Sequence, residues 1–443
     1  MRLTNVAQMD LVSGQLFSYA VLAAPRLGRA LPVSYDQGRH VGGGQRPGSW
    51  MAIAFRLTTP LASREQLGAA WDAVVLRHET LRTAFSIGED QQLVLHELEV
   101  SPGEWQHHVV APGRRTREVL REVFDTHCAP FERPSHRLCV VEPDATEDDR
   151  RPELVIGSDH AHVDMWSLVI LARDLLACLD DLREGREPGV DLPKAPGFAE
   201  HTAELDAMPP APEEIHRRWA DILGAGGGDM PTFPLPLGEL SPVPTEVVEV
   251  RDVLDAESTE RLTAIARERG VRLIGLGISV LTQATMALSG RPFRAVFPVH
   301  SRHDVHWREA CGWFITNAVI ESSDPDPSSC IAAVAEATRL GSWPLAPILA
   351  PYGELLSTPG LFAVSWLDAR RLPVPRAQAS EPKYVSAAIR TDGVMIWFAV
   401  DESGLHLRCR YPDTPQARRN VGRWLDAVEA GLRDLAAHDA TPA

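Results

Sequence analysis

Helix and strand signals alternate through both halves of this chain, on either side of a stretch rich in proline and glycine. The stretch includes PPAP (209–212) and GAGGG (224–228), which break regular structure and mark a connection between folded parts. Alternating helices and strands predict an α/β (α+β) fold. We therefore expect an N-terminal lobe at 1–185, a crossover at 186–245 and a C-terminal lobe at 246–443.

Apolar periodicity predicts individual elements in both lobes. In the first, WMAIAFRL (50–57) has the length of a strand, and Ser63 and Gln66 have capping-box spacing ahead of a helix. The other elements are predicted in the same way from apolar runs and helical faces. They are strands at 137–141, 154–158, 293–299, 362–367, 394–400 and 405–411, and helices at 165–182, 255–270, 272–289 and 415–436, the last with Val421, Trp424, Leu425 and Val428 on one face.

Composition restricts the location and the partners of the protein. The six cysteines are scattered without CxxC spacing, which is typical of a reducing cytoplasm. No apolar run approaches the ~20 residues of a membrane span, and the N-terminus does not resemble a signal peptide. A net charge of −16 at 443 residues disfavours nucleic acid and repels acidic carrier proteins or coenzyme A at long range. Docking of such a partner would need a basic patch, for which the candidates are Arg114, Arg115, Arg117, Arg121, Arg217 and Arg218.

One short stretch contains the candidate catalytic residues. It is SDHAHVDMWS (158–167), which follows a predicted strand and includes the start of a predicted helix. Loops at strand ends in α/β folds are common ligand sites. His160 there could act as a general base, since the pKa of histidine lies near the working range. Two other interpretations stay open. His160 could satisfy a buried hydrogen bond, or His160, His162 and Asp164 could begin a zinc site of the HxHxD type, in which Met165 replaces the closing histidine.

Further stretches resemble motifs of the condensation-domain superfamily, in the right order and over nearly the whole chain. The loop itself resembles HHxxxDG, and RHETLRTAF (77–85) resembles RHExLRTxF, which is the most specific match. The opening resembles polyketide-associated acyltransferases more than the modules of nonribosomal peptide synthetases. The remaining matches are Ser34–Gln37 with S-x-x-Q, 216–223 with YWxxxL, 297–302 with PVxxR and 311–320 with VGxFVNTLPLR.

The resemblance implies two chloramphenicol-acetyltransferase-like lobes that form a V around a central tunnel. An acyl thioester on phosphopantetheine, carried by an acyl or peptidyl carrier protein or by CoA, would enter one side. A small molecule with a hydroxyl or an amine would enter the other side. The resemblance makes His160 catalytic and pairs Asp164 with Arg302 as structural support. It implies a free-standing, cytoplasmic, monomeric acyltransferase of natural-product or lipid biosynthesis that holds no bound cofactor or metal.

The chain departs from the family pattern at two positions of the loop. Asp159 replaces the first histidine, and Met165 replaces a glycine whose amide lies near the thioester, so that its side chain would narrow the tunnel. Asp159, Met165, Trp166, Trp313 and Asn317 are expected to line the substrate path. The departures leave open a catalytically inactive docking or scaffold protein of the same fold, beside a zinc-dependent hydrolase as the second alternative.

Overall fold

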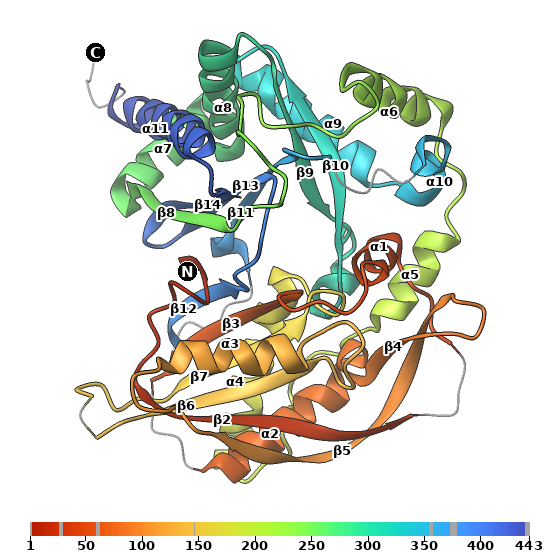
Figure 1. The fold of residues 1–443 in the computed structure, drawn as a ribbon, viewed down its shortest axis with the longest axis vertical. Coiled ribbons are helices and arrows are strands. Elements are labelled where there is room, and N and C mark those ends of the chain that lie inside the picture. The colour runs from red at the N-terminus through yellow and green to blue at the C-terminus, as the bar shows by residue number, and fades with distance from the viewer. Residues whose placement is uncertain are drawn as a thin grey trace. The chain divides into compact units, whose positions relative to one another are not determined.

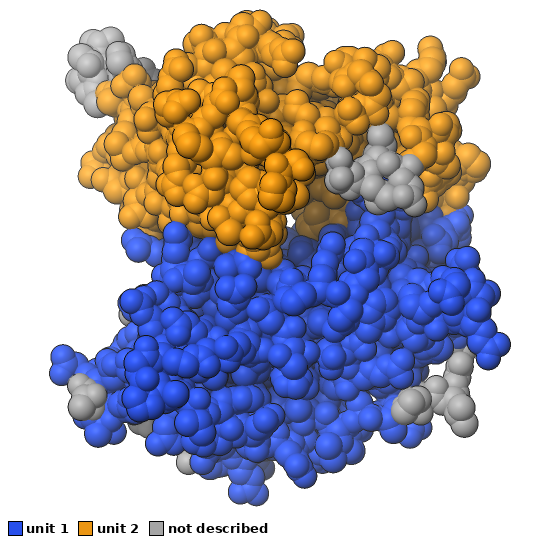
Figure 2. Space-filling model, viewed as in Figure 1, with its two compact units in different colours: residues 1–207, 302–314, 372–388 blue, residues 208–301, 315–371, 389–443 orange. Residues whose placement is uncertain are grey.

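The computed structural model describes residues 2–25, 30–58, 63–145, 147–353, 358–372 and 379–438. The chain forms two compact units, coloured separately in Figure 2. Unit 1 holds residues 1–207, 302–314 and 372–388, and unit 2 holds 208–301, 315–371 and 389–443.

The units do not follow the contiguous ranges expected from the sequence. Residues 186–207 of the expected crossover fold with unit 1, and its remainder folds with unit 2. Two segments of the expected C-terminal lobe, 302–314 and 372–388, also belong to unit 1. The reason is long-range pairing, in which a strand from residues 379–386 joins the sheet of unit 1. The V shape and the tunnel stay predictions.

Unit 1 is built on an eight-stranded sheet, in the order β1-β12-β3-β7-β6-β2-β5-β4. The strand pairs are antiparallel except for β1 with β12. The strands are β1 Arg2–Asn5, β2 Gly14–Pro25, β3 Trp50–Leu57, β4 Thr83–Ile87, β5 Leu93–His108, β6 His136–Pro143, β7 Glu153–Asp159 and β12 Ala379–Ser386. The helices are α1 Tyr35–Gly42, α2 Arg64–Arg77, α3 Thr116–His127, α4 Met165–Arg183 and α5 Phe198–Asp206, with short 3-10 turns η1 Glu79–Arg82 and η2 Val305–Glu309.

Side-chain alternation along the strands assigns helices to the two faces of this sheet. Trp50 on β3 packs its ring 5.0 Å from Phe124 of α3, and Gly157 on β7 faces the same ring. His136, on the opposite face of β6, packs 5.5 Å from Trp71 of α2. Successive residues of a strand point to opposite faces, so α3 covers one side of the sheet and α2 the other. Helix α4 packs against α2.

Unit 2 is built on a six-stranded sheet, in the order β10-β9-β11-β13-β14-β8. Only β11 runs parallel to its neighbours β9 and β13. Helices α7, α8 and α11 pack on one another, as Figure 1 shows. The strands are β8 Glu246–Asp255, β9 Phe293–His300, β10 Ile315–Ser322, β11 Phe362–Asp368, β13 Val394–Asp401 and β14 Gly404–Pro412. The helices are α6 Glu213–Ala225, α7 Ala256–Glu268, α8 Leu273–Ser289, α9 Pro327–Gly341, α10 Leu345–Leu349 and α11 Pro415–His438.

The elements predicted from periodicity are confirmed. The expected strand at 50–57 is β3, and Ser63 caps α2 by accepting a hydrogen bond from the amide of Gln66 at 3.1 Å. The predicted buried face of α11 is fully buried, and the indole of Trp424 on that face donates to Thr285 at 3.1 Å. Apolar periodicity is a local property, which is why these elements could be predicted from the sequence.

Within the described part of the chain, no single helix is long and apolar enough to cross a bilayer. Helices α7 and α8 reach that length and apolarity only when taken together, and they meet at 96°.

The close approach of α3 to β7 generates a stability prediction. A methyl group at position 157 would lie 2.6–2.8 Å from the Phe124 ring, so Gly157→Ala should lower the free energy of unfolding by about 1–3 kcal/mol. Urea unfolding measures the change. As a control, Gly422→Ala in α11 meets no atom within 4 Å and should raise stability by up to about 1 kcal/mol. A Gly157→Ala protein as stable as the parent would contradict the packing described here.

Candidate active site

The loop that carries His160 leaves the most enclosed strand of unit 1. All seven residues of β7 are buried, between β3 and β6. At the end of the strand, the amide of Asp159 donates to the carbonyl of Ser135 at 2.9 Å, and the amide of the next residue, His160, donates to the carbonyl of Ser49 at 3.0 Å. These bonds extend the hydrogen bonding of the sheet by one residue, so His160 begins the loop from a fixed backbone position.

The His160 imidazole is half-buried and stacks on an indole. Its ring lies 4.0 Å from the Trp313 ring, at an interplanar angle of 27°. Nδ1 is buried, and no other described residue hydrogen-bonds to it. Burial lowers the pKa of His160, and the positive charge of protonated His40 lowers it further, against smaller opposing effects of its own backbone, Asp159 and Asp164. The ring is therefore neutral near pH 7 and able to accept a proton.

Asp164 closes the loop through a buried ion pair with Arg302. One guanidinium nitrogen of Arg302 donates to Oδ2 at 2.5 Å and the other to Oδ1 at 3.2 Å, a forked geometry that fixes both partners. Asp164 is also the N-cap of α4, because its carboxylate accepts from the amide and the hydroxyl of Ser167, each at 2.7 Å. The amide of Phe314 adds a bond at 3.2 Å. The Asp164–Arg302 pair expected from the sequence is thus present.

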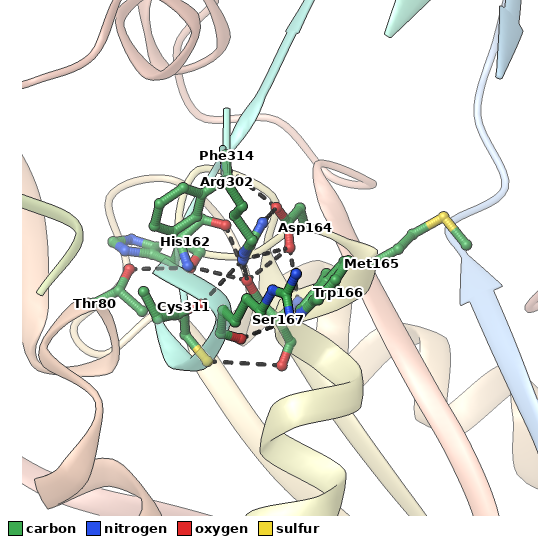
Figure 3. Close-up of polar contacts among 12 residues, drawn as sticks. Thr80, His162, Asp164, Met165, Trp166, Ser167, Arg302, Cys311 and Phe314 are labelled. Carbon is green, nitrogen blue, oxygen red and sulfur yellow. Dashed lines mark hydrogen bonds and ion pairs between the residues drawn. The ribbon is translucent and has the colours of Figure 1, made fainter. Parts of the chain in front are cut away.

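The segment 302–314 is bound to α4 by further contacts around this pair (Figure 3). Ser167 is the meeting point, because its hydroxyl accepts from the amide of Gly312 at 3.0 Å and from Arg302 at 3.0 Å. Arg302 also donates to the carbonyl of Ala310 at 3.0 Å, and its guanidinium lies 3.9 Å from the centre of the Phe314 ring. The two terminal nitrogens of the buried guanidinium thus have acceptors and the Phe314 ring faces it, whereas its Nε has no hydrogen-bond partner among the described residues.

Burial alone would raise the pKa of Asp164, but the charge and the hydrogen bonds of Arg302 outweigh it and hold the pKa below the ordinary value. Asp164 therefore stays ionised at neutral pH, and its oxygens are engaged by Arg302, Ser167 and Phe314. A carboxylate so committed cannot serve as the base of the reaction. This geometry gives Asp164 the supporting position that the resemblance implied.

Met165 and Trp166, which follow Asp164, are both half-buried. The Met165 side chain extends away from the Asp164–Arg302 pair in Figure 3, and its carbonyl accepts a hydrogen bond from the hydroxyl of Tyr384 on β12 at 2.8 Å. The indole of Trp166 donates to the carbonyl of Arg308 at 3.2 Å. Both residues therefore stand at the start of α4 without displacing the ion pair.

Asp159, the residue in place of the first motif histidine, is fully buried. Its carboxylate accepts from the Ser49 hydroxyl at 2.5 Å, from the amide of Ala161 at 2.9 Å, and from Nε2 of His40 at 3.4 Å. It does not line an open surface, contrary to the expectation of a substrate-lining residue. Its short side chain turns back into its own loop because these donors surround it.

His162 contacts Thr83 and Phe85, whereas His160 contacts Trp313, and this difference disfavours the zinc alternative. Its Nδ1 lies 3.3 Å from the Thr83 hydroxyl, and its ring packs 5.3 Å from Phe85. Asp164, the third member of HxHxD, is bound by Arg302. Among the residues that the structure describes, no three His, Cys, Asp or Glu side chains converge as metal ligands would.

Unit 1 brings together His160, Asp164, Arg302, Trp313 and Trp166, whereas Asn317 lies on β10 of unit 2, paired in register with Pro298. Sequence reasoning missed Ser167 and Tyr384, since a serine and a tyrosine carry no pattern of their own. It also missed His40, although a signal was present. His40 stands three residues after Gln37 of the S-x-x-Q element, on the same face of a helix.

Most of the arginines proposed as a docking patch are paired with carboxylates. Arg114 contacts Glu122 at 2.7 Å, and Arg121 contacts Asp125 at 3.1 Å. Arg218 lies between Glu321 and Glu336. Arg217 also has an acidic neighbour, at 4.0 Å. Such pairs cancel much of the local positive charge, so these arginines provide a weaker attraction for an acidic partner than the sequence suggested.

Comparisons with known proteins identify the family of the chain. The family model of the condensation domain matches residues 44–339. The chain is 24% identical to the acyltransferase PapA3 of Mycobacterium tuberculosis, over 82% of this chain and 79% of that protein. It is 23% identical to the trehalose-2-sulfate acyltransferase PapA2 of the same organism, over 90% and 88%.

Solved structures show the same fold. The PapA2 acyl transferase superposes with a TM-score of 0.84 at 20% identity, over 99% of this chain and 100% of that one. The first condensation domain of the calcium-dependent antibiotic synthetase gives 0.72 at 16% identity, over 94% and 98%. The chain belongs to the condensation-domain family, with its chloramphenicol-acetyltransferase-like fold. It is an acyltransferase of the kind found in lipid and natural-product biosynthesis.

The ion pair generates a second stability prediction. Arg302→Gln leaves the Asp164 carboxylate buried without its cation, and this should lower the free energy of unfolding by about 3–5 kcal/mol. Urea unfolding measures the loss. Arg302→Lys keeps the charge but not the fork, so we expect a smaller loss and a folded protein. Arg114→Gln breaks only an exposed pair and should leave the urea midpoint unchanged. Equal midpoints for Arg302→Gln and Arg114→Gln would refute the role of the pair.

Proposed function

We propose that His160 is the catalytic base of an acyl transfer from a thioester to a hydroxyl or amine. The observation that carries the proposal is a half-buried, neutral imidazole, fixed at the end of a buried strand, in a loop that Arg302 and Asp164 hold closed. A base held in this way gains about 10²–10⁴ in rate over an unassisted reaction.

In the proposed reaction, Nε2 of His160 removes the proton of the acceptor as its oxygen or nitrogen attacks the thioester carbonyl. A new ester or amide bond forms and the carbon–sulfur bond breaks. The proton held by His160 passes to the departing thiolate, so the enzyme returns to its first state and a free thiol is released. The transfer is direct, because no serine or cysteine in the sequence occupies a recognisable nucleophile elbow.

We infer that the acyl donor is carried on phosphopantetheine, either on a carrier protein or as CoA. Membership of the condensation-domain family supports a thioester donor of this kind. With a net charge of −16 and most candidate arginines paired, long-range attraction contributes little to docking. Binding of the donor then depends on short-range contacts, and added salt, which screens the repulsion between the acidic protein and an acidic donor, should not weaken it.

A hydroxyl is the preferred acceptor. The relative PapA2 is named for trehalose-2-sulfate, and a sugar offers hydroxyl groups. An alcohol is a very weak acid in water, so a base must remove its hydroxyl proton as the oxygen attacks. In the proposed reaction, His160 is that base. When an alcohol and an amine of similar size compete for the same acyl donor, the masses of the products show whether the ester or the amide is formed.

The two departures from the family motif do not favour an inactive scaffold. Asp159 is satisfied by three hydrogen-bond donors within the loop and its neighbours. The Met165 side chain extends away from the ion pair, and Tyr384 holds its carbonyl. His160 therefore keeps a half-buried position and a free ring nitrogen, as a working base requires.

Replacement of His160 tests the assignment. His160→Ala should lower the release of free thiol from acyl-CoA donors, in the presence of an alcohol acceptor, by about 10²–10⁴-fold. The measurement is a thiol-reagent assay over a series of saturated acyl-CoA thioesters. His162→Gln is the matched control, because that ring faces Thr83 and Phe85, and it should keep most of the turnover. Full turnover by His160→Ala would show that His160 is not the base.

The pH dependence gives a separate test. The base must be neutral to act, so kcat/KM should rise with pH as His160 loses its proton and then stay level. Because burial and His40 lower the pKa of His160 from 6.5, the midpoint of the rise should lie below pH 6.5. A midpoint above pH 7 would contradict a lowered pKa at this histidine.

A further inference from the structure

The buried ring nitrogen of His160 is not held by a carboxylate. In many catalytic sites a carboxylate accepts a hydrogen bond from the second nitrogen of the histidine, which fixes the ring and stabilises the imidazolium formed during the reaction. Apart from its own backbone, no described residue hydrogen-bonds to Nδ1 of His160. The two carboxylates of the loop bind other groups, Asp159 the hydroxyl of Ser49 and Asp164 the guanidinium of Arg302. The orientation of the imidazole therefore depends on its packing.

Trp313 is the residue whose ring lies against this imidazole. The two ring centres are 4.0 Å apart and the ring planes differ by 27°, so the indole covers one face of the imidazole. The indole Nε1 is buried and has no acceptor among the described residues. A buried donor without an acceptor costs free energy, so hydrogen bonding does not explain why an indole stands here. The contact that does distinguish this position is the stack on His160.

The backbone on both sides of Trp313 is bound to the first turn of α4. The amide of Gly312 donates to the Ser167 hydroxyl at 3.0 Å, and the amide of Phe314 donates to Oδ2 of Asp164 at 3.2 Å. Asp164 is also the residue that ends the His160 loop and caps α4. The same carboxylate therefore positions both rings of the stack.

An indole that lies face-on favours a positively charged imidazole over a neutral one. The face of an aromatic ring carries negative partial charge, which attracts a cation within about 6 Å of the ring centre. In the proposed reaction, His160 is neutral at the start and becomes an imidazolium as it takes the proton of the acceptor. The indole then stabilises the transition state more than the ground state, and a difference of this kind raises kcat.

We propose that Trp313 is the positioning residue of His160, whose indole fixes the plane of the imidazole and stabilises the imidazolium that forms in the reaction. The inference rests on the proposed role of His160 as base. Trp313 acts through His160 and needs no contact with the reacting atoms. This role goes beyond the substrate-lining position that the sequence suggested for Trp313.

Substitutions at position 313 leave the charges around His160 in place. The charged or titratable groups beside the imidazole are His40, Asp159 and Asp164, with Arg46 next to His40 and Arg302 next to Asp164. Burial is the largest cause of the lowered pKa of His160. Leucine at position 313 keeps an apolar cover on the imidazole without an aromatic face, whereas phenylalanine keeps both. A comparison of these two variants therefore isolates the effect of the aromatic face.

The experiment combines NMR titration of the His160 ring, assigned with a His160→Gln protein, with kinetics of acyl transfer from a saturated acyl-CoA thioester to an alcohol. In Trp313→Leu, the imidazolium loses the aromatic face. The titration midpoint should therefore fall by about half a pH unit, and kcat by about 3- to 30-fold, with little change in KM. Trp313→Phe should keep a midpoint close to that of the parent protein and most of the turnover.

Trp366→Leu is the matched control. Trp366 is also half-buried and stacks on another ring, that of Phe398 at 5.3 Å, but it belongs to unit 2. Its replacement should leave the His160 midpoint unchanged. A tryptophan with a role in folding alone would lower the urea midpoint without moving the titration. Equal His160 midpoints in Trp313→Leu and Trp313→Phe, or a higher midpoint in Trp313→Leu, would overturn the proposal.

Failure of this inference can be told apart from failure of the proposed function. The NMR titration reports the effect of Trp313 on His160 whether or not the variants turn over substrate. If His160→Ala keeps full turnover while Trp313→Leu lowers the midpoint, the stack acts on the imidazole but His160 is not the base. If His160→Ala is inactive and the midpoint does not move, His160 is the base and Trp313 does not stabilise its charged form.

Discussion

The Asp164–Arg302 ion pair is the interaction on which the site depends. It joins a helix N-cap to a segment 138 residues away in sequence, and it is buried on both sides. An ion pair in this environment stabilises the fold only when its geometry is good and its remaining donors and acceptors are satisfied. Ser167, Phe314 and Ala310 bind most of the remaining polar atoms of the pair, and the buried Nε of Arg302 is left without a hydrogen-bond partner among the described residues. The loop of His160 is therefore closed by one interaction that tolerates little variation.

Two buried carboxylates hold the two ends of the His160 loop. Asp164 holds the C-terminal end of the loop to Arg302, and Asp159 holds the N-terminal end to Ser49 and His40. Both are buried and ionised, and both have a cation or a titratable imidazole beside them. The imidazole between them keeps Nδ1 buried and without a hydrogen-bond partner among the described residues. This arrangement explains how the loop tolerates an aspartate where the family has a histidine.

The long-range organisation of unit 1 was not accessible from local patterns. Segments 302–314 and 372–388 follow strands of unit 2 in the chain, yet they complete the site and the sheet of unit 1. Nothing in their sequence signals this, because strand pairing between β12 and β3 depends on complementarity of surfaces and on register. The two units are therefore not the contiguous lobes expected from the sequence, although the strands and helices that were predicted from periodicity are present.

The sequence by itself predicted part of the strands and helices, because apolar periodicity is local. The expectation that His160, Asp164 and Arg302 belong together came from the resemblance to the condensation-domain family, whose motifs can be read along the chain. Only the tertiary structure decided that His40 faces Asp159, that Trp313 stacks on His160, and that His162 turns toward Thr83. These contacts join elements far apart in sequence, and side-chain direction there is set by burial and hydrogen-bond satisfaction, which no single segment contains.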